Sequence, residues 1–139
     1  MSQEEKELLL KDLCARLPFR VSVKWKTAKN PAFIKNIDGE KLIIYREYSD
    51  DIYAWECCIE DIKPYLRPMS SMTEEEKQIM DNLWENNNKL VFADSGKVRR
   101  YRFYDISVVD FLNSRHFDYR GLIEKGLALE APDGMYNTK

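Results

Sequence analysis

The apolar residues at the start of the chain recur with a helical period. They stand three or four positions apart and therefore share one face of a helix. This stripe comprises Leu9, Leu10, Leu13, Cys14 and Leu17. Ser2 and Glu5 have the spacing of a capping box, which starts a helix by exchanging hydrogen bonds between side chain and backbone. Pro18 ends the pattern, because the residue before a proline is pushed out of helical geometry.

The period then changes to two, which is typical of half-buried strands. Apolar and polar residues alternate over 19–25, where the polar face is basic. The β-rich segments 32–37 and 41–48 flank Asp38-Gly39, a strong hairpin turn because both residues tolerate positive φ. A fourth segment covers 52–59. Four short strands joined by tight turns predict a small, strongly curved antiparallel sheet or a barrel.

A proline-containing segment, residues 59–76, separates the two halves of the chain. Pro64 and Pro68 stop the element that precedes them, since proline has no backbone N–H to donate. Thr73 and Glu76 then have the spacing of a second capping box, and the acidic first turn suits the positive end of the helix dipole. An apolar helix face follows, made of Ile79, Met80, Leu83 and Trp84.

The remaining chain predicts a hairpin and a further helix. Residues 90–93 and 98–104 are β-rich and flank the turn-like sequence 94–96. Asp105 or Ser107 can cap a helix that carries four apolar residues. Those residues are Val108, Val109, Phe111 and Leu112. A last helical turn around Leu122 and Ile123 is expected to stop at Gly126.

Together these patterns predict an α+β protein. Residues 1–69 are expected to form the N-terminal helix on the small antiparallel sheet or barrel. Residues 70–139 are expected to form a helix–hairpin–helix unit. The two parts should pack together as one compact domain, since 139 residues suit a single core.

Composition narrows the functional classes. The charged residues make up 33% of the chain but nearly cancel to a net charge of −2, so there is no global basic footprint for nucleic acid. No apolar run approaches the roughly 20 residues that cross a bilayer, and the acidic N-terminal segment lacks the pattern of a secretory signal. Three cysteines match neither a disulfide framework nor a zinc site. We therefore expect a cytoplasmic protein with buried free thiols and no membrane partner.

Catalytic and cofactor motifs are scarce. His116 is the single histidine and Asp118 lies two residues further on, so a small hydrolase with His116 as a general base oriented by Asp118 is one hypothesis. The simpler interpretation is structural, with the neighbouring aromatic residues docking the last helix. The acidic runs 4–7 and 74–76 lie in first helical turns, where capping explains them without a metal. No glycine-rich phosphate loop is present. We predict no catalytic residue, no cofactor and no metal.

Nucleic-acid binding is the main alternative to a protein-binding role. Basic and aromatic residues are interleaved on the predicted strand 98–104, and such a mixture can hold phosphates and stack bases. The candidate contacts are Lys97, Arg99, Arg100, Tyr101 and Arg102. On a strand these residues divide between two faces. An ordinary solvated sheet face is therefore the competing interpretation.

Aromatic residues of the β-rich half form the candidate protein interface. They exceed what a short sheet easily buries on one face, and exposed Tyr and Trp are favoured interface anchors. The candidates are Tyr45, Tyr48, Tyr53 and Trp55. Tyr45 and Tyr53 lie on either side of the turn at 49–51 and are expected to be near cross-strand neighbours. The alternative is that the N-terminal helix covers these rings as ordinary core.

Three segments resemble those of a known group of proteins. They are LLLKDLCARLP (8–18), KPYLRPMSSMTEEE (63–76) and HFDYRGLIEKGLALEAP (116–132). They look like segments of small uncharacterised proteins from phage and mobile-element regions of Bacteroides-type gut bacteria. The resemblance implies a cytosolic accessory protein of phage or prophage origin and supplies no catalytic residue. It does not extend to residues 20–58.

These observations favour a non-enzymatic accessory protein that binds a host or phage protein. A homodimer is compatible with this expectation. A nucleic-acid-binding module that uses the basic and aromatic strand is the alternative. A small hydrolase centred on His116 is the third hypothesis.

Overall fold

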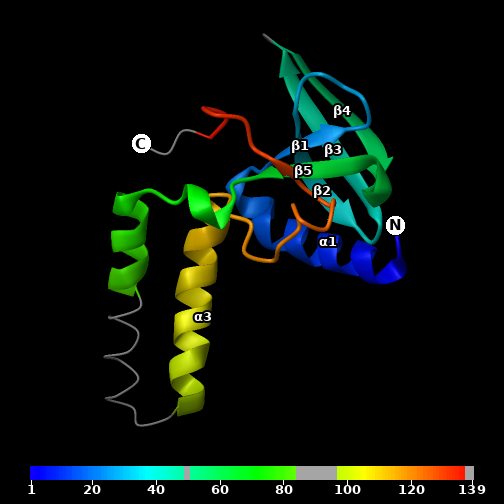
Figure 1. Cartoon of the computed structure of the whole chain (residues 1–139). Coiled ribbons are helices and arrows are strands. Elements are labelled where there is room, and N and C mark those ends of the chain that lie inside the picture. Colours follow the sequence, from blue (N-terminus) through cyan, green and yellow to red (C-terminus); the bar gives the residue numbers. More distant parts are fainter. Residues whose placement is uncertain (49–50, 84–96, 137–139) are drawn as a thin grey trace.

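The computed structural model describes residues 1–48, 51–83 and 97–136. The helical elements are α1 (Gln3–Arg16), a helix over residues 74–83, α3 (Lys97–Ser114) and three short 3₁₀ turns, η1 (Leu17–Phe19), η2 (Ile59–Asp61) and η3 (Met69–Ser71). The strands are β1 (Ser22–Trp25), β2 (Ala32–Asp38), β3 (Lys41–Tyr48), β4 (Asp51–Cys58), β5 (Ile62–Leu66) and β6 (Leu129–Glu130). The fold is α+β, as the sequence predicts (Figure 1).

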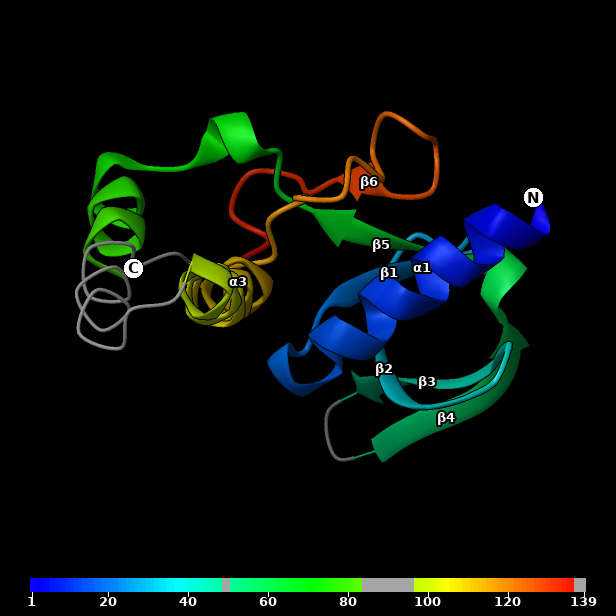
Figure 2. The same cartoon turned by 90° about the horizontal axis from the view of Figure 1, so that it is seen from below.

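The capping box at the start of α1 is present. The backbone N–H of Glu5 donates to Ser2 Oγ over 3.1 Å, and the backbone N–H of Ser2 donates to Glu5 Oε1 over 3.0 Å. Leu9 and Leu13 are fully buried and belong to the same core cluster as the strands. Figure 2 shows α1 lying against the curved sheet. The apolar stripe thus faces the sheet, as its spacing predicts.

The described strands form one sheet in the order β4-β3-β2-β1-β5-β6. All pairings from β4 to β5 are antiparallel, as predicted for residues 19–62, whereas β6 runs parallel to β5. The β2–β3 turn places Gly39 at φ 61°, a conformation that glycine adopts without strain. The barrel alternative is wrong, because β5 is followed in the sheet by β6 and not by β4.

The proline-containing segment folds differently from its sequence-based prediction. Pro64 does not stop a strand, since β5 runs through it and Pro64 pairs with Val23 of β1. The second capping box is confirmed: Glu76 N–H donates to Thr73 Oγ1, and Thr73 N–H donates to Glu76 Oε1, both over 3.1 Å. The segment is therefore a strand, a 3₁₀ turn and a helix start in succession.

The predicted second hairpin is not part of the described structure. Residues 90–93 lie outside the described residues, and residues 98–104 lie in α3 instead of a strand. The sequence explains the difference, because Tyr101, Tyr104 and Val108 are also spaced by three and four, which is a helical period. The helix that was expected to begin near residue 105 therefore begins at Lys97. Around Leu122 the chain forms a turn, with Gly126 at φ 75°.

Two apolar clusters stabilise the part of the protein that the structure describes. The larger cluster joins α1 to the sheet and also includes Leu122, Leu127 and Ala128 from the C-terminal part. The smaller cluster lies between α3 and the helix over 74–83, which run side by side (Figures 1 and 2). Within the described part of the chain, no helix is long and apolar enough to span a membrane.

Candidate functional site

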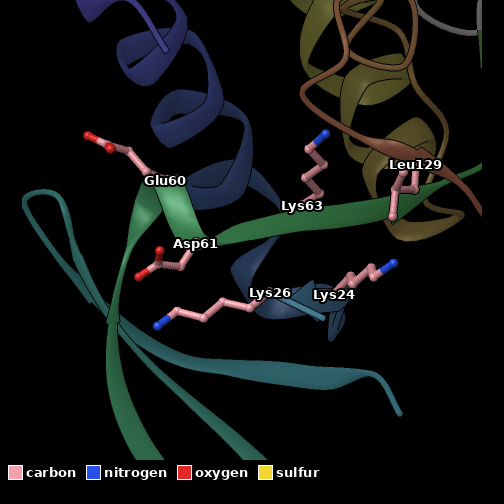
Figure 3. Close-up of a pocket in the computed structure, with 6 residues that line it drawn as sticks. All are labelled: Lys24, Lys26, Glu60, Asp61, Lys63 and Leu129. Atoms are coloured by element: carbon pink, nitrogen blue, oxygen red, sulfur yellow. The ribbon is translucent and has the colours of Figure 1, made fainter. Parts of the chain in front are cut away.

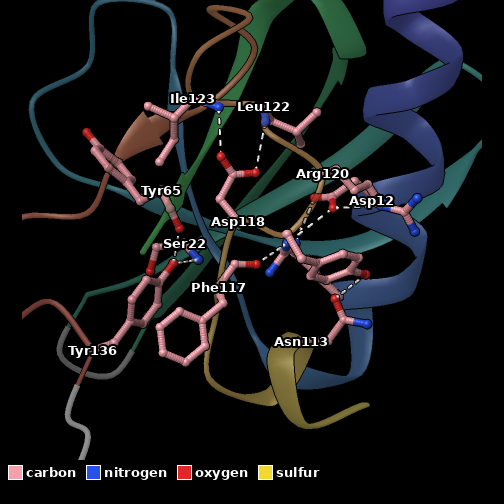
Figure 4. A network of polar contacts seen from close by, with 12 residues as sticks. Asp12, Ser22, Tyr65, Asn113, Phe117, Asp118, Arg120, Leu122, Ile123 and Tyr136 are labelled. Carbon is pink, nitrogen blue, oxygen red and sulfur yellow. Dashed lines mark hydrogen bonds and ion pairs between the residues drawn. The ribbon is translucent and has the colours of Figure 1, made fainter. Parts of the chain in front are cut away.

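A buried polar network connects α1 to the residues that follow α3 (Figure 4). Asp12 and Arg16 are both fully buried, and Arg16 Nε donates to Asp12 Oδ2 over 2.7 Å. Arg16 Nη2 also donates to the carbonyl of Phe117 over 2.6 Å. Arg120 Nε donates to Asp12 Oδ1 over 3.1 Å. Because a buried charge is costly without a partner, these bonds hold the two segments together.

A second buried ion pair anchors the helix over 74–83. Arg67 donates two hydrogen bonds to the carboxylate of Glu76, over 2.8 and 2.7 Å. The Arg67 guanidinium lowers the pKa of Glu76 from its usual value to about 2, and the Thr73 N–H bond acts in the same direction. The backbone of Arg67 exchanges bonds with the other segment: its N–H donates to His116 O, and its carbonyl accepts from Asp118 N–H. We call this region the junction. It comprises the two ion pairs, Asp12–Arg16 and Arg67–Glu76, and the segments of the chain that these pairs connect.

The junction does not bring His116 and Asp118 together as an acid–base pair. Both carboxylate oxygens of Asp118 accept backbone N–H groups, from Leu122 over 2.8 Å and from Ile123 over 3.0 Å. The His116 ring stacks on Tyr136 with 3.8 Å between centroids, and its Nδ1 has no hydrogen-bond partner among the described residues. Burial, with Arg16 and Arg67 nearby, lowers the pKa of His116 to about 4. The geometry matches the structural interpretation of this segment.

Tyr136 closes the junction on the sheet side. Its hydroxyl accepts the backbone N–H of Ser22 over 2.9 Å and donates to the carbonyl of Tyr65 over 2.7 Å (Figure 4). Burial raises the pKa of Tyr136 to about 12. The phenol therefore stays protonated and keeps its donor to Tyr65.

The proposed nucleic-acid contacts do not lie on a strand. Lys97, Arg99, Arg100, Tyr101 and Arg102 are all in the first turns of α3. The alternation that divided them between two strand faces does not apply to a helix, where residues three and four apart share a face. The structure therefore removes the geometric basis for a nucleic-acid interface on a basic and aromatic strand.

The predicted aromatic interface is divided between the two faces of the sheet. In the β3–β4 register, Tyr45 pairs with Ala54, Arg46 with Tyr53, and Ile44 with Trp55. Residues paired across antiparallel strands share a face, so Tyr53 and Trp55 lie on the α1 side with buried Ile44, and Tyr45 lies on the other side. Tyr45 and Tyr53 are therefore not facing neighbours, contrary to expectation. The side chain of Tyr48 lies outside the described residues.

On the α1 side, the rings are partly covered. Trp25 and Trp55 meet edge to face, with 5.1 Å between centroids, and both pack against the large core. Their indole N–H groups have no acceptor among the described residues. Tyr53 is 55% exposed. The alternative that the N-terminal helix covers these rings as ordinary core thus fits the two tryptophans better than it fits Tyr53.

Strand β4 is the strongest candidate for a binding surface. It is the last strand at one end of the described sheet order, and its eight residues pair with β3 without a bulge. Ile52 and Tyr53 are adjacent on it and 70% and 55% exposed, one on each face. Ile52 also borders a hollow of about 350 Å³ on the outer face. The hollow is lined by Ile34, Lys35, Tyr45, Glu47 and Ile52.

Most natural edge strands carry features that prevent further pairing, such as lysine, proline or a bulge. β4 has neither lysine nor proline and its pairing is regular; its charged residues are Asp51 and Glu56. Sequence analysis missed Ile52, because exposure at an edge depends on strand order and that order is set by long-range pairing.

Comparison with protein families, curated proteins and solved structures finds no match to this chain.

Proposed function

We propose that the protein is a non-enzymatic binding protein that captures an extended segment of a partner protein on the free edge of β4. The observation that supports this most directly is the regular edge of β4, which lacks lysine, proline and a bulge and carries exposed Ile52 and Tyr53. The resemblance of segments 63–76 and 116–132 to phage and mobile-element proteins supports an accessory role with a host or phage partner.

The edge defines the chemistry of the partner segment. Alternate backbone N–H and C=O groups of an edge strand point away from the sheet, and an added strand satisfies them. Side chains of an added strand alternate between the two faces. One set would contact Ile52 and the apolar part of the outer hollow, and the other set would contact Tyr53. The partner is therefore an extended segment with β-branched or aromatic residues at alternate positions.

The test is an affinity purification from the native host, with three versions of the protein as bait. The binding variant is Ile52→Lys with Tyr53→Lys, which places two charges on the edge strand. The control variant is Ile106→Lys, because Ile106 is also exposed, at 54%, but lies on α3. We expect the wild type and the control to retain the same partner and the binding variant to lose it. Hydrogen exchange of the complex should then show new protection of the amides in 51–58.

Three results would overturn the proposal. The first is retention of the same proteins by all three baits. The second is a protected footprint away from β4. The third is a wild-type protein that sediments as a dimer through β4, in which case the occupant of the edge is a second copy. Circular dichroism of each bait confirms that the lysines have not unfolded it.

A further inference from the structure

Two lysines lie directly opposite each other where β1 meets β5. Lys24 pairs with Lys63 in the antiparallel register. Like charges in this position destabilise a strand pair, whereas opposite charges stabilise it. Elsewhere in the sheet unlike charges meet diagonally across two strands, where Lys41 of β3, the register partner of Cys58, forms an ion pair with Glu56 of β4 over 3.7 Å. The repulsion at Lys24 and Lys63 thus calls for an explanation.

The two lysines border an open hollow of about 280 Å³ (Figure 3). Its lining residues are Lys24, Lys26, Glu60, Asp61, Lys63 and Leu129. Figure 3 shows Lys24 and Lys63 on the side of Leu129, and Lys26 extending toward the side of Asp61. The hollow lies between β1, β5, η2 and the start of β6, and none of its lining residues belongs to β4.

The two carboxylates at this hollow form no ion pair with Lys24 or Lys63 within the described residues. Glu60 forms an ion pair with Lys6 of α1, which lowers the pKa of Glu60. Asp61 accepts the backbone N–H of Cys58 over 3.4 Å. Within the ranges that the structure describes, neither Lys24 nor Lys63 forms an ion pair. Lys24 and Lys63 therefore have no ion-pair partner among the described residues, while the Asp61 carboxylate, whose hydrogen bond comes from a neutral N–H, lines the same hollow.

Lys26 provides a second, independent observation at the same hollow. Its φ is 47°, a left-handed conformation that is strained for a residue other than glycine. The backbone holds it there, because Lys26 N–H donates to Asp61 O and Ala28 N–H donates to Trp25 O, each over 2.9 Å. Strained residues of this kind cluster at functional sites. The backbone of a third lysine is thus fixed at the rim of the hollow, and its ammonium lies 5.2 Å from the centroid of the Trp25 ring.

We propose that this hollow binds the phosphate group of a small anion, with Lys24 and Lys63 as its main contacts and Lys26 at its rim. Phosphate carries up to two negative charges and several acceptor oxygens, and lysine binds it as a point charge. A volume of about 280 Å³ is at the small end of ligand sites. The net charge of −2 disfavours a long polyanion such as nucleic acid. This inference does not depend on strand addition at β4.

Titration with pyrophosphate, followed by calorimetry and by amide chemical shifts, tests the site. We expect saturable binding at low salt, with shift changes concentrated at β1 and β5. The variant Lys24→Gln with Lys63→Gln should bind about tenfold more weakly, because the two charges together contribute on the order of 1 to 2 kcal/mol. The matched control is Lys11→Gln with Lys125→Gln, which removes the same charge from two exposed lysines outside the hollow. It should bind like the wild type.

Thermal unfolding gives a second measurement, which distinguishes the loss of the binding site from a loss of structure in the variant. Pyrophosphate should raise the Tm of the wild type and of the control, and at the same concentration should raise that of the double variant less. Without pyrophosphate, the single variant Lys63→Gln should be at least as stable as the wild type, since it removes the facing charge. Parallel titrations with inorganic phosphate and ribose 5-phosphate distinguish a free phosphate from one carried on an organic group.

Equal weakening of both double variants would overturn the proposal, because it would indicate a general counterion effect. Absence of saturation in the wild type would also overturn it. So would binding of a single-stranded oligonucleotide by a wild type that ignores pyrophosphate, since the surface would then recognise a polyanion.

Discussion

His116 lies where burial and charge both oppose its protonation. Burial, followed by the charges of Arg16 and Arg67, lowers its pKa to about 4, against about 6.5 in an unfolded chain. Between these two values the unfolded chain binds more protons than the folded one. The free energy of unfolding therefore rises with pH across this window, and the contribution is lost as pH falls from about 6.5 to about 4.

Substitution of His116 by asparagine tests this dependence. Asparagine does not titrate, and it tolerates the left-handed φ of 64° at this position. We expect the variant to be less stable at pH 7, since it loses the stacking on Tyr136. Its free energy of unfolding should nevertheless depend less steeply on pH between about 6.5 and about 4. Urea unfolding at several pH values measures how the free energy of unfolding of each protein depends on pH. An identical dependence in the wild type and the variant would contradict its assignment to His116.

Three segments that are far apart in the sequence meet at the junction. Asp12 and Arg16 come from 8–18, Arg67 and Glu76 from 63–76, and Asp118 from 116–132. Each is buried and paired or capping. The junction is thus the part of the molecule where a single charge change leaves a partner buried alone, which costs several kcal/mol. Residues 20–58 contain β4 and two of the three lysines at the hollow.

At the scale of elements, local patterns were sufficient for α1 and for the meander β2–β3–β4. The expected strands 32–37, 41–48 and 52–59 correspond to β2, β3 and β4 within one residue at each end. The period-two alternation and the Asp38-Gly39 turn depend only on neighbouring residues, so long-range contacts do not alter the strands that they predict. β5 was missed because Pro64 suggested a break, whereas its strand character comes from pairing with β1, about 40 residues away. The same long-range pairing decides that β4 is an edge, which no local pattern reveals.

The two faces of β4 give an element-scale prediction for the cysteines. Cys57 is buried, and burial, with Asp61 nearby, raises the pKa of its thiol to about 11. Cys14 and Cys58 are exposed, contrary to the expectation that all three thiols are buried. Since the thiolate is the reactive form, a colorimetric thiol reagent at pH 8 should modify two thiols quickly in the native protein. The third should react only after unfolding in urea, and mass spectrometry should identify it as Cys57.

Three fast-reacting thiols in the native protein would contradict this description of β4. Cys57→Ser provides the control, because it should leave the fast phase unchanged and remove only the slow one. Cys58→Ser should remove one fast equivalent. Adjacent residues of one strand would then differ in reactivity for the single reason that they face opposite sides of the sheet.

At the scale of the whole molecule, the junction connects the two apolar clusters. Phe117 belongs to the smaller cluster, while its carbonyl accepts from Arg16 of α1. Leu122, a few residues later, belongs to the larger cluster and is held by Asp118. A chain that alternates between clusters over so few residues cannot release one of them without disturbing the other. We therefore expect the described parts to unfold together.

The measurement uses a Trp84→Phe background, in which Trp25 and Trp55 are the remaining tryptophans and fluorescence reports on the larger cluster. Leu112→Ala then removes apolar contacts from the smaller cluster, where Leu112 is 5% exposed. A cavity of this kind costs about 2 to 5 kcal/mol. In urea, the fluorescence transition and the far-ultraviolet dichroism transition should coincide and should shift together to lower urea. A fluorescence midpoint that stays in place while the dichroism midpoint moves would show that the two clusters unfold independently and that the junction does not couple them.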